Sequence, residues 1–107
     1  MKKKLQLPVH PGEILEEEFL KPLGITKYRL AKELHVPAQR IGDIVNGKRA
    51  ITAETALRLA RYFKTTADFW LGLQMHYELQ CAEDVNEKQI NKEIKPRDLL
   101  DKADKAA

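Results

Sequence analysis

The stretch TKYRLAKELHVPAQRIGDIVNG, residues 26–47, decides the fold of this 107-residue chain. Apolar side chains recur within it every three or four residues, which predicts amphipathic helices rather than strands. We expect one helix over residues 26–35, capped by the threonine that opens the stretch, and a second over residues 38–46. Pro37 disfavours helical geometry in the residue before it, and Gly47 can adopt the positive φ that follows a last helical turn. The pattern predicts two short helices joined by about three residues, which is helix-turn-helix spacing.

Three further helices are expected around this pair, because apolar residues keep helical spacing in both directions along the chain. Two of them open with a threonine that can serve as the N-cap. They are expected over residues 11–20, from Thr52 onward, and from Thr66 to about Glu83. The residues expected to face the core are Ile14, Leu15, Phe19, Leu30, Ala31, Leu34, Ile41, Ile44, Val45, Ala56, Leu57, Ala60 and Phe63.

Length and composition give the domain organisation. A chain of 107 residues, of which 43% are hydrophobic and 33% are charged, fits one modest globular domain. We expect an all-α, five-helix domain over residues 9–83, preceded by a basic arm over residues 1–8. Residues 84–107 carry balanced charge and thinly spaced apolar residues, which predicts a charged C-terminal tail or a weak final helix.

Several classes of function are disfavoured. The longest mainly apolar run, residues 69–75, is far too short for a membrane-spanning helix. Cys81 is the single cysteine, which excludes an intramolecular disulfide and favours a reducing compartment, so we expect a cytoplasmic protein. The three histidines are scattered, and no nucleophile or phosphate loop accompanies the acidic run at residues 16–18. We therefore expect no metal, no other cofactor and no enzymatic activity.

Positive charge is concentrated in the centre of the chain. The whole chain has a formal net charge of +3, whereas residues 26–64 contain nine basic and three acidic residues, a balance of +6. A local excess of this size favours a polyanionic partner, and nucleic acid before a membrane surface, because no basic helix carries a large apolar face. The charge pattern alone is equally compatible with the alternative that these lysine and arginine side chains are simply solvated surface residues.

The second helix of the central pair contains residue types that read DNA. The major groove of B-DNA admits one α-helix, and a short helix braced by another can present its N-terminal side chains to base edges. Glutamine can bond adenine and arginine can bond guanine through two hydrogen bonds each. The residues expected to contact bases are Ala38, Gln39, Arg40 and Asp43. The residues expected to contact phosphates at the groove edges are Lys27, Asn46, Lys48 and Arg49.

The last expected helix is apolar on nearly every side over residues 69–75, which is more than one packed face absorbs. This pattern favours a contact between two subunits. The residues expected at that dimer interface are Phe69, Trp70, Leu73 and Gln74. In the alternative, Leu73 and Tyr77 fill the core while Trp70 is one of several scattered surface residues.

These motifs resemble a known family. LAKELHVP at residues 30–37, IVNGKRAIT at 44–52 and ALRLA at 56–60 closely resemble the XRE DNA-binding domain of phage repressors and Cro-like proteins, which has a lambda-repressor-like fold. More narrowly, HPGEIL at residues 10–15 and TADFWLGLQ at 66–74 resemble HigA-type antitoxins, also called VapI-like proteins. Two residues depart from the wider pattern, since histidine replaces the usual turn glycine at position 35 and proline replaces the usual hydroxyl cap at position 37.

The resemblance implies a homodimeric repressor that binds an inverted-repeat operator in its own toxin-antitoxin operon. It further implies that the protein neutralises a HigB-type toxin, a small ribosome-associated mRNA endonuclease. In that family the first turn of the reading helix contacts bases, which corresponds to the four base-contacting residues named above. The alternatives are a stand-alone XRE-family regulator with no toxin partner, and an interaction protein that keeps the fold without binding an operator.

Overall fold

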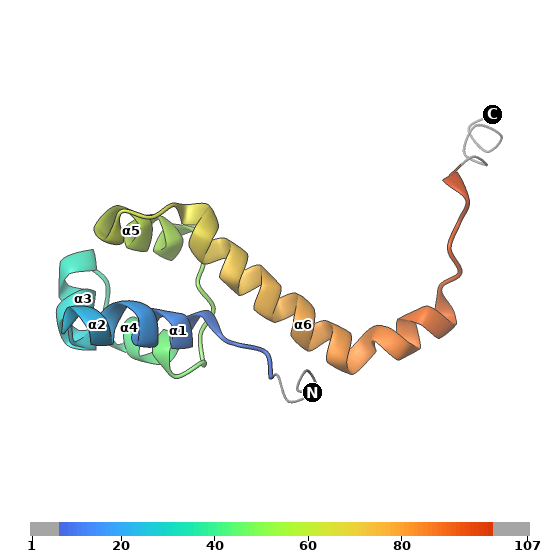
Figure 1. Ribbon diagram of the computed structural model, residues 1–107, viewed down its shortest axis with the longest axis horizontal. Helices are drawn as coiled ribbons and strands as arrows, with labels where there is room; N and C mark the ends of the chain where they lie inside the picture. Colours follow the sequence, from blue (N-terminus) through green and yellow to red (C-terminus); the bar gives the residue numbers. More distant parts are fainter. Residues whose placement is uncertain (1–6, 100–107) are drawn as a thin grey trace.

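The computed structural model describes residues 7–99. The first six residues of the expected N-terminal arm and the last eight of the expected tail lie outside this range. Every α- or π-helical segment of the described chain is drawn in Figure 1, and no strand occurs among the described residues. The segments are α1 (Pro11–Ile14), the π-helix η2 (Leu15–Leu20), α2 (Lys21–Leu23), α3 (Lys27–Leu34), α4 (Ala38–Val45), α5 (Ala53–Phe63) and α6 (Ala67–Glu93). Because α1, η2 and α2 follow one another without a break, the expected all-α, five-helix architecture is confirmed.

The first of these five helices contains one wide turn and ends three residues later than expected. Within η2 the hydrogen bonds run five residues back, and the Lys21 amide donates to the Glu16 carbonyl. Pro22 follows directly, and a proline would clash with the carbonyl four residues before it in a regular α-helix. The wider turn accommodates this proline, so the helix continues to Leu23 and ends at Gly24, which has φ +67°.

One apolar core joins all five helices. Its buried members are Leu15, Leu20, Leu30, Ala31, Leu34, Ile41, Ile44, Ile51, Ala56, Leu59 and Trp70. The expectation that Leu57 faces this core is wrong, because its side chain is 62% exposed while Leu59 is fully buried. Thr52 caps α5 as expected, but the inward face of α5 runs through Ala56 and Leu59, and Leu57 lies a quarter turn or more away from it.

Helix α1 lies directly on the backbone of α4. A Cβ atom on Gly12 would come within 1.7 Å of the Ile44 carbonyl oxygen and 2.9 Å of the Val45 Cα. No side chain larger than hydrogen fits in that space, so Gly12 is required for the two helices to approach this closely. The contact fixes α4 against the rest of the domain.

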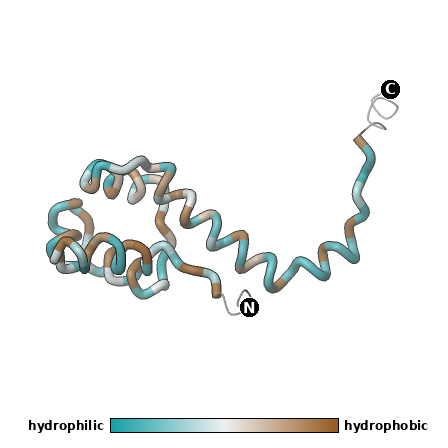
Figure 2. Tube along the Cα trace, viewed as in Figure 1, coloured by the Kyte–Doolittle hydropathy of each residue, from teal (hydrophilic) through white to brown (hydrophobic). Residues whose placement is uncertain are grey.

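Helix α6 is longer than the sequence predicted. It extends to Glu93, ten residues beyond the expected end near Glu83. Residues 84–93 contain no glycine or proline, and Pro96 follows the end of the helix, so nothing in that segment interrupts helical geometry. Figures 1 and 2 show its second half extending away from the domain, with polar and apolar residues mixed along it. No helix in the described range is long and apolar enough to span a bilayer.

Candidate nucleic-acid interface

The two central helices meet as the spacing predicted. Thr26 caps α3, and its hydroxyl accepts a hydrogen bond from the Arg29 amide at 3.0 Å. His35 ends α3 in the left-handed conformation with φ 60°, which a histidine adopts more readily than most residues. Pro37 precedes α4 without a side-chain cap. The short connection between α3 and α4 therefore has helix-turn-helix geometry, and both departures from the family pattern are accommodated.

The outer face of α4 is uncovered in the described chain. Ile41 and Ile44 are fully buried on its inner face. Gln39 is exposed and lies on the side of the helix away from those two residues. The expected base-contacting residues Ala38 and Gln39 are thus free of the core, while Arg40 and Asp43 are half-buried at its edge. All four come from the first two turns of α4, so the structure brings them together.

Arg40 does not extend freely from this face. Its Nη1 lies 3.5 Å from Oε1 of Glu54 at the start of α5. Glu54 also accepts hydrogen bonds from Arg58, which together with the nearby Arg40 lower the pKa of the Glu54 carboxyl. An exposed pair of this kind contributes little to stability, so a guanine could replace Glu54 as the partner of Arg40. Sequence reasoning missed Glu54, although its spacing of four residues from Arg58 was a visible signal.

The expected phosphate-contacting residues occupy two places. Lys27 opens α3, and Asn46, Lys48 and Arg49 lie in the segment between α4 and α5. All four are exposed, and within the described range none of them forms an ion pair. This segment turns at Gly47, which has φ +77°, and the Lys48 amide donates to the Asp43 carbonyl at 2.8 Å. The cations are therefore available to an external anion, which is what phosphate binding requires.

His10 supports this segment and was not identified from the sequence as part of the site. Its Nδ1 accepts a hydrogen bond from the Gly12 amide at 2.9 Å and so caps α1. Burial lowers the pKa of His10, and a hydrogen bond to the Arg49 backbone and the charge of Glu13 partly oppose that shift. The ring also lies edge-on to Tyr77 of α6, with 4.9 Å between ring centroids.

Two members of the expected dimer interface lie inside the chain's own core. Trp70 is fully buried and its Nε1 donates to the Thr65 hydroxyl at 2.8 Å. Gln74 is 6% exposed, and its Oε1 accepts from the Ile51 amide at 2.8 Å. Neither side chain can reach a second subunit in this conformation, which corrects the prediction. Of the other two, Phe69 is 40% exposed and Leu73 is half-buried.

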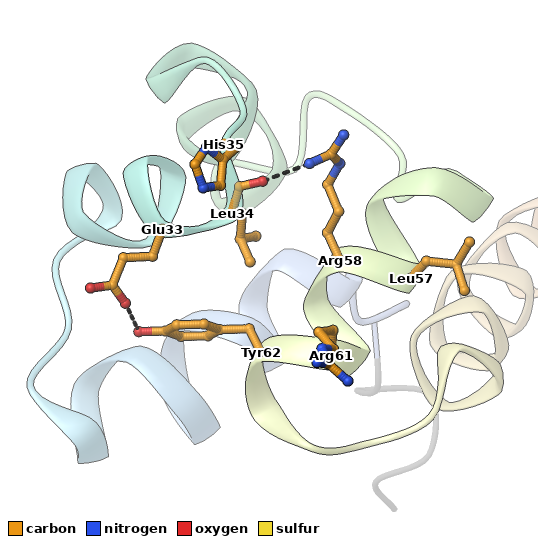
Figure 3. A pocket seen from close by; sticks show the side chains of 7 residues that line it. All are labelled: Glu33, Leu34, His35, Leu57, Arg58, Arg61 and Tyr62. Atoms are coloured by element: carbon orange, nitrogen blue, oxygen red, sulfur yellow. Dashed lines mark hydrogen bonds between the residues drawn. The ribbon is translucent and has the colours of Figure 1, made fainter.

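A groove separates the end of α3 from α5, and Figure 3 shows the side chains that line it. Its volume is about 340 Å³, and Leu34, Leu57 and Tyr62 form its apolar part. Tyr62 donates a hydrogen bond to Glu33, which raises the pKa of the phenol and lowers that of the carboxyl. Arg58 spans the groove and donates to the Leu34 carbonyl at 2.8 Å.

No group of three or more metal-ligating side chains gathers anywhere in the described chain.

Known proteins resemble this chain in the region that contains α3 and α4. The HTH_3 helix-turn-helix family model matches residues 17–70. The chain is 54% identical over 81 residues to virulence-associated protein I of Dichelobacter nodosus, covering 75% of each protein. It resembles the structure of the Pseudomonas aeruginosa antitoxin HigA with the higBA promoter at 49% identity and a TM-score of 0.81, covering 83% of this chain and 97% of that one.

A second solved structure, antitoxin GraA in complex with its operator, is 35% identical with a TM-score of 0.82 and covers 87% of this chain and 94% of that one. The chain belongs to the XRE-type helix-turn-helix family that includes the HigA antitoxins.

Proposed function

We propose that this protein is an antitoxin that also represses its own operon by binding operator DNA, and that it acts in the cytoplasm. The observation that supports the proposal is the uncovered outer face of α4, where Gln39 is exposed, together with the exposed side chains of Lys27, Lys48 and Arg49. Close structural relatives with this architecture have been solved with promoter or operator DNA. By analogy with the antitoxin names of these relatives, its protein partner is a HigB-type mRNA endonuclease toxin.

In this proposal the N-terminal half of α4 enters the major groove. Gln39 bonds adenine, and Arg40 exchanges Glu54 for guanine, each discriminating against a wrong base by roughly 1–3 kcal/mol. Ala38 contacts a thymine methyl or the groove wall, and Asp43 accepts from cytosine or orients Arg40. The four phosphate-contacting residues set position and orientation without reading sequence.

Operator binding requires two copies of the chain in this proposal, because a two-fold dimer matches an inverted repeat with half-sites about 34 Å apart. Trp70 and Gln74 are buried within one chain, so they do not form the contact between the two copies. The surface that remains on α6 is the opposite side of the helix, where Met75 is 68% exposed and Leu79 is 56% exposed. We place the subunit contact there, with Phe69 and Leu73 at its border.

The DNA part of the proposal is tested by fluorescence anisotropy of the full chain with the duplex upstream of its own gene. If five or six phosphates are neutralised per dimer, log affinity falls against log salt with a slope of about −5. Gln39→Ala is expected to relax base preference, whereas Lys48→Ala weakens binding to every sequence. Lys88→Ala, on the distant half of α6, is the matched control and leaves binding unchanged. A flat salt dependence would contradict operator binding.

The toxin part is tested by co-expression with the neighbouring gene. We expect the two products to co-purify and the antitoxin to restore growth that the neighbour alone stops. If the neighbouring product neither stops growth nor co-purifies while operator binding persists, the protein is a stand-alone regulator.

A further inference from the structure

We propose that His10 is a positioning residue for DNA binding, because it holds the loop of residues 46–50 in one conformation against α1 and α6. This inference rests on the proposed function, since the loop contains three of the four residues assigned to phosphates. His10 does not touch DNA in this proposal. It acts through the backbone of the residues that do.

Both nitrogens of the His10 ring are used. Because Nδ1 accepts from the Gly12 amide at 2.9 Å, this nitrogen carries no hydrogen. The other nitrogen therefore carries the hydrogen, and the ring has a polar interaction with the Arg49 backbone that favours its protonated form. One neutral imidazole thus connects the first turn of α1 with the middle of the loop.

The ring also packs against the loop and against α6. The position that a Cβ would occupy on Gly47 lies 3.9 Å from Cγ of His10, so the imidazole lies directly beside the turn of the loop. On another side the Tyr77 ring meets it at an interplanar angle of 71°. The imidazole is therefore fixed between the loop and the first half of α6, and it cannot move without disturbing one of them.

His10 fills a gap in the series of contacts that hold the loop. The Lys48 amide is bonded to the Asp43 carbonyl, and the Ile51 amide is bonded to Gln74. Between these two points the loop residues are exposed, and His10 meets this stretch through its ring beside Gly47 and through a polar interaction with the Arg49 backbone. A loop that is already ordered loses less conformational entropy when its cations bind phosphates, which strengthens binding.

The test is the substitution His10→Asn in the full chain. Asparagine is a good N-cap residue, so it replaces Nδ1 as the acceptor for the Gly12 amide, but its short side chain does not reach the Arg49 backbone. Lys88→Asn introduces the same residue on the exposed second half of α6, away from the loop and from the proposed subunit contact, and is the control. Both variants are compared with the natural chain on the duplex upstream of its gene and on a duplex of random sequence.

We expect His10→Asn to weaken binding to both duplexes. If its loop holds the bound conformation about one tenth of the time, apparent affinity falls about tenfold for each subunit. The salt slope becomes less steep by about one for each phosphate that the loop no longer neutralises. Amide hydrogen exchange accelerates at residues 46–50 in the free protein while the amides of α1 keep their protection. Lys88→Asn changes none of these quantities.

Unchanged loop exchange in His10→Asn would overturn the inference whatever the DNA results, because the loop would then not depend on His10. Faster exchange throughout α1 as well as the loop would also overturn it, since His10 would then be only a helix cap. If the natural chain fails to bind DNA but His10→Asn still loosens the loop selectively, the proposed function is wrong and the coupling of His10 to the loop stands.

Discussion

The two halves of α6 share one continuous helical backbone but are helical for different reasons. In the first half, Trp70 and Gln74 are buried in the domain. In the second half every described residue from position 82 to the end of the helix is exposed, including Val85 at 79% and Ile90 at 47%. Isolated helices of about a dozen residues are marginal in water, and most helical stability in proteins comes from tertiary packing.

The comparison shows that the first half is part of the domain, whereas the second half depends on local interactions. A side-chain hydrogen bond joins Gln89 to Glu93 one turn later, and such pairs add only about 0.2–0.5 kcal/mol each. Substitutions in the two halves should therefore have unequal effects, and the following predictions test that inequality.

The largest effect is expected for Trp70→Ala. Removing this side chain leaves a cavity between α5 and α6 and removes the ring from Phe19 and Phe63, which lie 5.0 Å and 6.2 Å away between centroids. The free energy of unfolding should fall by about 3–5 kcal/mol. Denaturant titration followed by circular dichroism measures it. A loss below about 1 kcal/mol would mean that the first half of α6 is not part of the cooperative core.

A smaller effect is expected for Gln74→Ala. This change leaves the buried Ile51 amide without its acceptor, which should cost about 1–3 kcal/mol of unfolding free energy. Gln89→Ala removes the same amide group from the second half and should change stability by less than about 0.5 kcal/mol. Equal losses in the two variants, measured in the same titrations, would remove the distinction between the halves.

The smallest effect on the domain is expected for Ala82→Gly. Glycine costs about 1 kcal/mol relative to alanine within a helix, so amide exchange should accelerate over residues 83–93. The thermal unfolding midpoint of the domain should not change, because those residues lie outside the core. A lower midpoint that also depends on protein concentration would indicate instead that the second half of α6 packs against another copy of the chain.

The sequence predicted what depends on local chemistry. Threonines at the expected positions cap α3, α5 and α6, and the helix-turn-helix followed from Pro37 and the apolar spacing. The sequence did not predict which side of residues 69–75 turns inward. Periodicity cannot choose a face in a segment that is apolar all round, so the pattern indicated a partner subunit for Trp70 instead of the core.

The candidate site was likewise predicted only where it depends on local chemistry. Exposure of Gln39 and of the loop cations follows from where they stand relative to buried neighbours in the same helix or turn. The pairing of Arg40 with Glu54 and the contact of His10 with the loop depend on helices brought together from distant positions. No local pattern in the sequence gives those distances.

Because Gly12 packs closely against the Ile44 carbonyl, the side of α4 that faces α1 leaves no room for a larger residue at position 12. The residues on the opposite side of α4 can be substituted. Its inward surface is fitted so tightly that a single added methyl group on the neighbouring helix would displace it. Its outward residues, Gln39 foremost, touch nothing that the fold requires. The outward residues of α4 could therefore be substituted to bind new operator sequences without redesigning the rest of the domain, as long as Gly12 is kept.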